Sequence, residues 1–306
     1  MTPAARLQAV VEILDALDGT GLPADRFVRD YFRARRYAGS KDRAAIAELV
    51  FAIQRTRSLL AWRMQGDTSR RLVIAMLVME GLSEDEIAAL FDGSQYGPAA
   101  LSGDERAAIA SPPSGEPPRH VMGEFPAFLE PELFRAFGDD LLAEMQALQA
   151  RAPVDLRANT LATTRDGLAA ALRAEGFSAE PTRFSPWGLR LPPGEGSARL
   201  SASPLFAAGQ FEFQDEAAQI AALLCAARPG MRVLDFAAGA GGKTLALAAA
   251  MQNKGEIAVH DSDPGRLAML PPRAQRAGVT IIRTSLPPPE RGRWREAPEG
   301  VMTPPP

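Results

Sequence analysis

The residues best suited to bind a ligand form a glycine-rich stretch from Val233 to Thr244, VLDFAAGAGGKT. Its apolar start predicts a strand, and Lys243 to Gln252 predicts a helix, so the small residues between them form a tight turn. Small side chains let a ligand approach the backbone, and the start of a helix favours a negatively charged group. The stretch can therefore hold a phosphate, a dinucleotide or S-adenosylmethionine.

Two nucleotide-binding patterns match this stretch incompletely. The triphosphate-binding pattern G-x-x-x-x-G-K-[ST] ends well in the Gly-Lys-Thr of residues 242–244, but its first glycine falls on Ala237. The dinucleotide pattern G-x-G-x-x-G is met by Gly239 and Gly241, but Thr244 stands in place of its third glycine. A P-loop nucleotidase and a dinucleotide-dependent enzyme are therefore the weaker alternatives.

A carboxylate follows at a spacing that suits an adenosine ligand. Asp261 comes nineteen residues after Gly242, at the end of a second predicted strand, EIAVHD. A carboxylate in this place can accept hydrogen bonds from both hydroxyls of a ribose. S-adenosylmethionine contains both an adenosyl ribose and a methionine carboxylate, so the turn and Asp261 together favour that cofactor. A tight strand-to-helix turn with a surface aspartate, and no ligand, remains open as the alternative.

Cysteine and histidine are scarce, which excludes several kinds of site. The 306 residues contain one cysteine, Cys225, and two histidines, His120 and His260. One cysteine forms neither an intramolecular disulfide nor a cysteine-based metal cluster, so we expect no metal and a reducing cytoplasm. Cys225 lies among apolar residues of a predicted helix, and we interpret it as a small buried residue. We interpret His260 as a half-buried structural residue.

The apolar pattern divides the chain into segments of different type. Residues 1 to about 107 show the spacing of short amphipathic helices, which predicts an all-α bundle. A proline-rich connector from Ala110 to Pro126 and a further helical piece follow. A small α/β module begins near Arg151, and from Phe206 a strand–helix–strand–helix–strand order predicts a doubly wound sheet. Seven of the twenty-four residues from Arg283 to Pro306 are proline, which predicts a disordered tail.

Local signals mark two helix starts and one helix break. Ser40 is a predicted N-cap, and Ser83 lies three residues before Glu86, which is the spacing of a capping box. Pro271 and Pro272 interrupt the last predicted helix before the third strand of the doubly wound sheet. We expect these residues to set the boundaries of the elements around them.

Positive charge is concentrated in the helical part. Between Gly21 and Val73 there are twelve Lys and Arg against five Asp and Glu, or +7, so the net charge of −3 leaves −10 for the rest. This distribution favours contact with a polyanion such as RNA. Arginines on solvated helix surfaces are the alternative interpretation. No run of about 18 apolar residues is present, so we expect no membrane-spanning segment.

Three stretches resemble the Sun/Fmu, or RsmB-like, family of RNA (cytosine-5) methyltransferases: FQDEAAQIAALL, VLDFAAGAGGKT and IAVHDSDPGRL. The loop of that family reads close to V-L-D-x-C-A-A-P-G-G-K-T, and here Gly239 and Ala240 replace its usual Ala-Pro. The basic segment RFVRDYFRARRYAGSKDRAAIAELVF is similar to the NusB-like RNA-binding domain of RsmB-type members. APVDLRANTL is similar to the small domain that precedes the catalytic one, so the resemblance covers roughly residues 1–282.

The resemblance implies a fold, a cofactor and a partner. The fold would be multi-domain α + α/β: a NusB-like bundle (1–145), a small α/β module (150–205), a partial Rossmann-like methyltransferase sheet (206–283) and a Pro/Arg-rich tail (284–306). The implied activity is methylation of cytosine C5 in RNA, above all ribosomal RNA, with S-adenosylmethionine as cofactor and without a membrane or a metal. The implied cofactor-binding residues are Ala237, Ala238, Gly239, Ala240, Gly241, Gly242, Lys243 and Asp261.

The catalytic cysteine that the resemblance implies does not occur in its usual contexts. Enzymes of this class are implied to add a cysteine thiolate to C6 of cytosine, which enables C5 to attack the methyl group. The contexts D-A-P-C-S-G and T-C-S are absent, and about seven strands are expected where we find three. We leave the catalytic residue unassigned and expect an inactive gene product, interrupted after the third strand. A non-catalytic RNA-binding protein acting through the helical half is the alternative.

Overall fold

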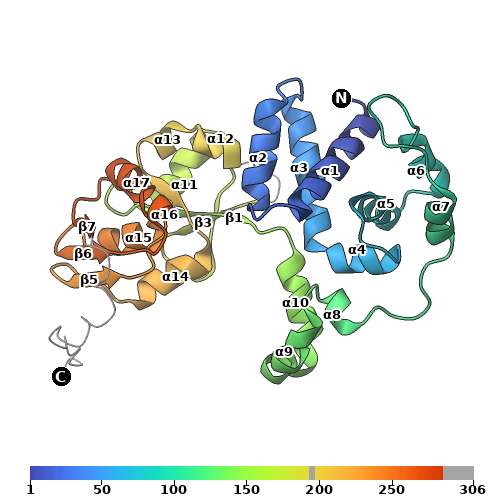
Figure 1. The fold of residues 1–306 in the computed structure, drawn as a ribbon. Coiled ribbons are helices and arrows are strands. Elements are labelled where there is room, and N and C mark those ends of the chain that lie inside the picture. Colours follow the sequence, from blue (N-terminus) through green and yellow to red (C-terminus); the bar gives the residue numbers. More distant parts are fainter. Residues whose placement is uncertain (193–196, 285–306) are drawn as a thin grey trace. The chain divides into compact units, whose positions relative to one another are not determined.

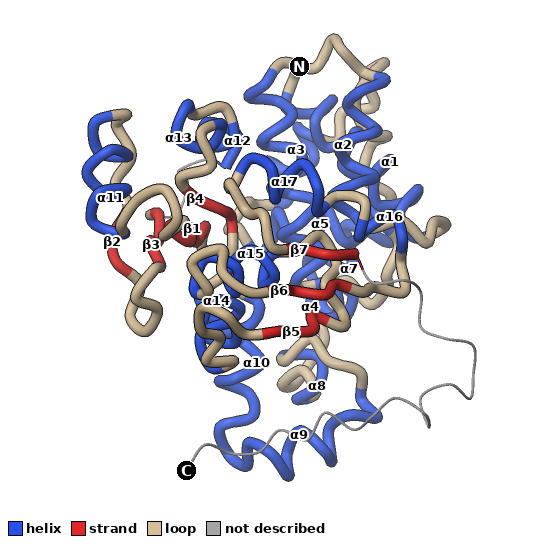
Figure 2. The backbone as a smooth tube through the Cα atoms, turned by 90° about the vertical axis from the view of Figure 1, so that its left-hand side faces the viewer, coloured by secondary structure: helices blue, strands red, loops and turns tan. Residues whose placement is uncertain are grey.

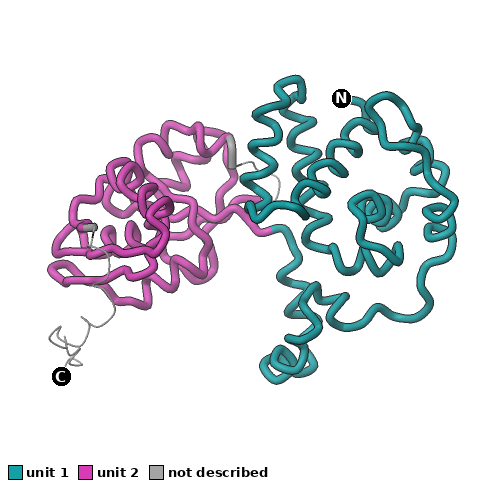
Figure 3. Tube along the Cα trace, in the orientation of Figure 1, with its two compact units in different colours: residues 1–151 teal, residues 152–306 magenta. Residues whose placement is uncertain are grey.

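The structure is a computed structural model that describes residues 1–192 and 197–284. The predicted tail lies outside the described residues, apart from Arg283 and Thr284, which belong to a strand and not to a disordered segment. The chain divides into two compact units, residues 1–151 and residues 152–306, which Figure 3 distinguishes by colour. Within the described ranges no helix has the length and hydropathy that a bilayer crossing requires.

Unit 1 contains only helices among its regular elements (Figure 1). Its amphipathic stretches form short helices because their apolar residues recur every three or four positions. The helices are α1 (Pro3–Asp18), α2 (Ala24–Ala34), α3 (Ser40–Arg55), α4 (Arg57–Arg63), α5 (Ser69–Met79), α6 (Glu84–Leu90), α7 (Gly103–Ala110), α8 (Arg119–Met122), η1 (Ala127–Leu129), α9 (Glu130–Phe137), η2 (Gly138–Asp140) and α10 (Leu141–Gln149).

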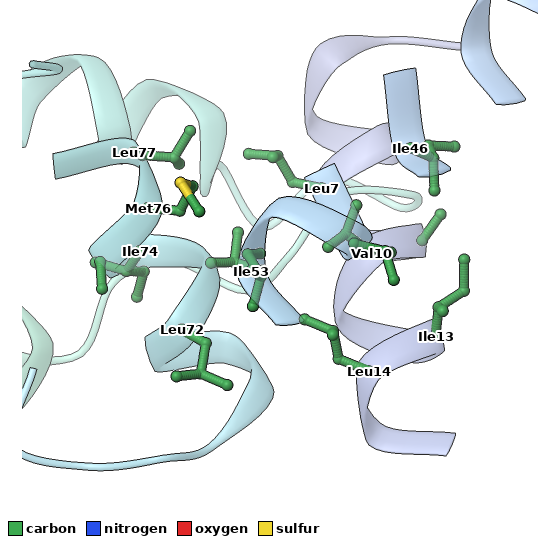
Figure 4. Packing of buried hydrophobic residues seen from close by; sticks show 14 of the residues in the cluster. Leu7, Val10, Ile13, Leu14, Ile46, Ile53, Leu72, Ile74, Met76 and Leu77 are labelled. Carbon is green, nitrogen blue, oxygen red and sulfur yellow. The ribbon is translucent and has the colours of Figure 1, made fainter. Parts of the chain in front are cut away.

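The core of unit 1 is built from the apolar faces of α1, α3 and α5 (Figure 4). Burial of each such aliphatic side chain contributes roughly 1.5–3 kcal/mol, which offsets the entropy lost by ordering several short helices. Side chains of this core include Val10, Ile13, Leu14, Ile46, Ile53, Leu72 and Ile74, each at most 1% exposed.

The predicted helix boundaries hold in part. The capping box is confirmed, since Ser83 and Glu86 each bind the other's backbone N–H at the start of α6. The assignment of Ser40 as N-cap was wrong by one residue: Gly39 is the N-cap and Ser40 opens α3. The proline-rich connector contains the single helical turn α8, and Glu124 beyond it accepts the N–H groups of Ser58 and Leu59 at the start of α4.

Unit 2 contains both strands and helices. Together with the helical unit 1, it confirms the expectation of a multi-domain chain with all-α and α/β parts. Its elements are β1 (Val154–Ala158), α11 (Arg165–Ala174), β2 (Glu180–Pro181), β3 (Gly188–Leu191), α12 (Ser197–Ser201), α13 (Pro204–Ala207), β4 (Phe211–Phe213), α14 (Glu216–Leu224), β5 (Arg232–Asp235), α15 (Gly242–Ala250), β6 (Glu256–Val259), α16 (Pro264–Leu267), α17 (Leu270–Arg276) and β7 (Ile282–Thr284).

The strands of unit 2 form two sheets (Figure 2). The first is antiparallel with the order β2-β3-β1-β4, and Leu156 at its centre faces Leu189 on one side and Phe213 on the other. The second is parallel with the order β5-β6-β7. Strand β4 belongs to the first sheet although it lies beyond residue 205, where we had expected the small module to end.

The second sheet begins as predicted but differs in one helix. Pro271 and Pro272 do not interrupt a helix; they lie in the first turn of α17, where a missing backbone N–H does no harm. The break lies just before them, between α16 and α17.

Strand β5 forms an open edge of the second sheet. Among the described strands it pairs only with β6, as the small number of predicted strands implies. Leu234 at this edge is 55% exposed, and Leu223, Leu224 and Met231 nearby in the sequence are exposed as well. Strands of parallel sheets are usually covered on both faces, and edge strands usually expose few apolar side chains. Strand β5 differs from other strands of parallel sheets in both respects.

Candidate cofactor site

The glycine-rich turn connects the carboxyl end of β5 to the start of α15 in a conformation that only glycine adopts readily. Gly239 and Gly241 have φ values of +54° and +85°, in the left-handed region. Gly241 is the N-cap of α15, and a Cβ atom built on it would lie 2.1 Å from Cδ1 of Leu270. Gly241 therefore meets two requirements at once, a positive φ and the absence of a side chain.

Asp261 holds the turn in place from the end of β6. Its Oδ2 accepts the N–H of Gly239 at 2.7 Å, and its Oδ1 accepts the N–H of Asp263 at 2.8 Å. These two backbone donors lower the pKa of the Asp261 carboxyl below its usual value, so the group is ionised at neutral pH. Each oxygen retains a second lone pair that can accept a ligand hydroxyl.

Backbone hydrogen bonds fix the turn against the neighbouring strand. The N–H of Ala238 donates to the carbonyl of His260 at 3.0 Å, and the N–H of His260 donates to the carbonyl of Asp235 at 3.0 Å. The fully buried hydroxyl of Thr244 donates to Oδ2 of Asp235 at 2.7 Å. The turn and Asp261 are thus preorganised by the two adjacent strands.

The structure brings the sequence-predicted cofactor residues together around one strand-to-helix turn. Ala238 is buried in the core of the second sheet, whereas Ala237 and Lys243 are exposed. Within the described part of the chain, the Lys243 ammonium has no ion-pair partner. Its charge is therefore available to an anionic ligand group near the start of α15.

Two arginines that sequence reasoning missed also contact the turn. A Cβ atom on Gly239 would lie 2.9 Å from Nη2 of Arg266, so this guanidinium lies against the turn. Arg273 donates to the carbonyl of Ala240 at 2.7 Å and to Oε2 of Glu212 at 2.8 Å. Both arginines follow Asp261 in the sequence without a recognisable motif, so only the fold reveals them.

Arg273 belongs to a buried polar network that joins the turn to the first sheet. Glu212 on β4 is buried and also accepts a hydrogen bond from Arg276 at 2.5 Å. Arg157 on β1 is buried and donates to Gln214 at 2.6 Å. Burial away from water lowers the pKa of the Arg157 guanidinium to about 10. The alternating pattern of β1 correctly predicts that its apolar residues are buried. It does not predict that the polar residues on the other face of the strand are buried as well.

Cys225 and the histidines do not extend the site. The expectation that Cys225 is buried was wrong: it is exposed at the C-cap of α14, because the apolar neighbours in this helix are themselves exposed. Its Sγ donates to the carbonyl of Ala221 in the same helix at 3.3 Å. His260 is half-buried, as expected, beside the ring of Phe236. The described residues contain no group of three side chains suited to hold a metal ion.

The residues present fit S-adenosylmethionine by chemical type. Gly239 and Gly241 give the turn its shape through their positive φ values, and the first N–H groups of α15 and Lys243 can face a carboxylate. Asp261 offers ionised oxygens at the end of the adjacent strand, where the hydroxyls of a ribose bind in sheets of this kind. A glycine-rich turn between a strand and a helix of a parallel sheet, next to a small antiparallel sheet, defines an α/β fold with a candidate site for a nucleotide cofactor.

Comparison with known proteins finds similarity to RNA methyltransferases. The model of the ferredoxin-like domain of RsmF/B-like methyltransferases matches residues 125–194. The chain is 33% identical over 154 residues to the 25S rRNA (cytosine-C(5))-methyltransferase nop2 of Schizosaccharomyces pombe, covering 50% of this chain and 25% of that protein. It is 34% identical over 130 residues to the probable ribosomal RNA small subunit methyltransferase B of Synechocystis, covering 42% and 29%. The resemblance to the Sun/Fmu, or RsmB-like, family is confirmed.

Solved structures agree with this fold. The crystal structure of PH0851 superposes with a TM-score of 0.70 at 19% identity, covering 93% of this chain and 69% of that one. A methyltransferase homologue from Pyrococcus horikoshii superposes with a TM-score of 0.51 at 25% identity, covering 55% of this chain and 54% of that one. The chain spans about a quarter of the length of the Schizosaccharomyces relative.

Proposed function

We propose that this protein has the cofactor-binding function of an S-adenosylmethionine-dependent RNA (cytosine-5) methyltransferase of the type that modifies ribosomal RNA. The observation that carries the proposal is the glycine turn held by Asp261, in a chain similar to enzymes named for this reaction. The proposed cofactor site consists of residues 237–243 and Asp261. The cofactor would supply the methyl group, and RNA would supply the cytosine.

Each part of the proposed site has a distinct task. The Asp261 carboxylate accepts hydrogen bonds from the ribose, and Gly241 lets the turn pack against Leu270, which fixes the shape of the turn. The start of α15 and the charge of Lys243 attract the methionine carboxylate. Arg273 steadies the turn through the carbonyl of Ala240. Together these groups fix the direction in which the methyl group is presented.

The covalent step needs a thiolate, and the sequence offers one cysteine. Cys225 lies at the end of α14, which precedes β5, and its hydrogen bond stays within its own helix. Among the described residues its hydrogen bond therefore does not reach a group that would activate a catalytic thiolate. We propose that this chain binds the cofactor without transferring the methyl group.

We further propose that the helical part, residues 1–145, is a NusB-like RNA-binding domain, and that residues 150–205 and 206–283 form the small module and the cofactor domain. The support is the concentration of exposed arginines on α2, among them Arg26, Arg29 and Arg33. Lys and Arg that neutralise phosphates supply most of the sequence-independent affinity for RNA. A non-catalytic RNA-binding protein would use this part alone.

Two binding measurements on the same preparation test the proposal and its alternative. Isothermal titration calorimetry should detect S-adenosylmethionine binding to the wild-type chain and a large loss in Gly241→Asp. A pure RNA-binding protein would show no cofactor binding in either chain, while its RNA affinity stayed equal in both. A nucleotidase would instead hydrolyse ATP or GTP and lose that activity in Lys243→Ala. Absence of cofactor binding to the folded wild-type chain would end the methyltransferase proposal.

A further inference from the structure

All three tyrosines of the chain line one pocket in the helical unit. Tyr31, Tyr37 and Tyr96 come from three different segments: α2, the turn before α3, and the loop between α6 and α7. They surround a pocket of about 890 Å³ against α1. Tyr37 and Tyr96 are 73% and 70% exposed. Tyrosine is an amphipathic ring with few rotatable bonds, so a cluster of exposed tyrosines supplies contact area at low entropic cost.

Tyr31 is the fixed member of the cluster. Its hydroxyl donates to Oε2 of Glu12 at 2.8 Å, and the guanidinium carbon of Arg35 lies 3.7 Å from the centre of its ring. Glu12 is also 3.8 Å from Arg35. The carboxylate in the pocket is thereby compensated by a neighbouring cation, and one face of the Tyr31 ring is already covered by Arg35.

The pocket also offers amide groups beside the rings. Gln8 on α1 and Gln95 next to Tyr96 both line it. A side-chain amide carries two donors and an acceptor and can pair with the edge of a heterocycle. Aromatic faces together with amide edges suit a flat ligand that has a polar rim.

Positive charge flanks the pocket along the chain. Arg36 is the residue before Tyr37, and both are exposed, as is Lys41 at the start of α3. Arg70 lines the pocket, and the guanidinium of Arg35 lies over the ring of Tyr31. Cations in this arrangement can neutralise phosphates on either side of a stacked base.

We propose that this tyrosine pocket binds unpaired bases of an RNA strand, with Tyr37 and Tyr96 as stacking surfaces. The inference rests on the proposed RNA substrate and names the surface that holds it. Unpaired bases expose their faces to aromatic side chains, whereas bases in an A-form duplex hide them in the stack. A proline-rich peptide could also lie on tyrosine rings, but the flanking cations favour a strand that carries phosphates.

The test measures RNA affinity in the full 306-residue chain. Fluorescence anisotropy would follow a labelled twelve-nucleotide single strand of mixed sequence at constant salt, with wild type, Tyr37→Ala, Tyr96→Ala and the double variant. Loss of one stacked base weakens binding about 5- to 160-fold, so each single variant should lose at least about fivefold. Tyr37→Phe and Tyr96→Phe keep the ring and should bind nearly as wild type does.

Phe128→Ala is the matched control, because Phe128 is 78% exposed in the same unit but does not line the pocket. It should bind RNA like wild type. Equal RNA affinity of the double alanine variant and wild type would overturn the proposal, and so would preference for a duplex of the same sequence. Binding of a proline-rich peptide in place of RNA would also overturn it. Cofactor binding, measured in parallel, should be unchanged in the tyrosine variants, so failure of the cofactor site and failure of the pocket are distinguishable.

Discussion

At the residue scale, Asp261 combines a structural task with a proposed binding task. Its two oxygens hold the N–H groups of Gly239 and Asp263, and the same carboxylate is the proposed acceptor for a ribose. The two roles of Asp261 can be measured separately. Its role in the turn affects the stability of the folded chain, and its proposed role in binding affects only the affinity for the cofactor.

Asp261→Asn should weaken S-adenosylmethionine binding by roughly 10- to 100-fold, because an amide offers one acceptor in place of two charged oxygens. Calorimetric titration of both chains measures this change. Glu80→Gln is the control, since Glu80 is an exposed carboxylate outside the cofactor unit and should bind cofactor like wild type. An Asp261→Asn chain with wild-type affinity would show that the carboxylate serves the turn only.

Gly241→Ala should destabilise the protein more than Gly230→Ala does. Both glycines have a similar positive φ, +85° and +91°, so both substitutions incur about 1–2 kcal/mol of backbone strain. A new Cβ on Gly230 meets no atom within 4 Å, whereas on Gly241 it lies 2.1 Å from Leu270. Overpacking adds about 1–3 kcal/mol at Gly241 only. Urea unfolding measures the difference, and equal midpoints would contradict the predicted clash.

At the element scale, the sequence predicts those helices, strands and caps that are determined by residues close together in the chain. The order of strand, glycine turn and helix from β5 to α15 follows from apolar periodicity and small residues, and the capping box of α6 follows from Ser83 and Glu86. Strand β4 was missed because three residues are too few to show a period. The exposure of Cys225 was missed because it depends on which other elements pack against α14, and the sequence of the helix does not show this.

The buried carboxylate on β4 offers a test of the network that joins the two sheets. Glu212→Gln removes the charge shared by Arg273 and Arg276, whose side chains are 22% and 23% exposed. Breaking a buried pair costs about 3–5 kcal/mol, and we expect the lower end because both arginines still reach water. Glu256→Gln removes a carboxylate that pairs with the exposed Arg283 and should cost less than about 1 kcal/mol. Thermal unfolding of both variants provides the comparison.

At the scale of the whole molecule, carboxylates with lowered pKa set the response to acid. Hydrogen bonds to the ionised carboxylates hold the pKa values of Asp42, Glu86, Asp92, Glu105, Glu216 and Asp261 below the ordinary values of 3.8 for Asp and 4.5 for Glu. A carboxyl whose pKa is depressed in the folded state stabilises that state above the unfolded pKa and loses the effect as pH falls through the folded pKa.

We therefore expect the free energy of unfolding to be nearly constant from neutral pH to about pH 5 and to fall steadily below about pH 4. Urea midpoints measured at intervals of one pH unit would show this profile. Glu86→Gln should flatten part of the decline, because it removes the carboxylate of the capping box. Stability that rises on acidification below pH 4 would be the opposite of this expectation.

The whole chain should bind cofactor without turnover. Incubation with tritiated S-adenosylmethionine and ribosomal RNA should leave no label in the RNA, because the only cysteine, Cys225, lies at the C-cap of α14. Cys225→Ser should bind cofactor as wild type does, since the Sγ contacts only its own helix among the described residues. Label in RNA that disappears in Cys225→Ser would instead make Cys225 the nucleophile.

The pairing of β1 with β4 has a consequence for the order in which this protein matures on the ribosome. Residues 125–194, which match the ferredoxin-like domain, contain three strands of the antiparallel sheet, but the fourth begins only at Phe211. Asn159, just after β1, further donates to the carbonyls of Gly209 and Ala277, at 2.8 and 2.9 Å. In a nascent chain that ends at residue 194, the segment that follows unit 1 should therefore remain sensitive to protease, and its resistance should develop only after the segment through Ala277 has left the exit tunnel.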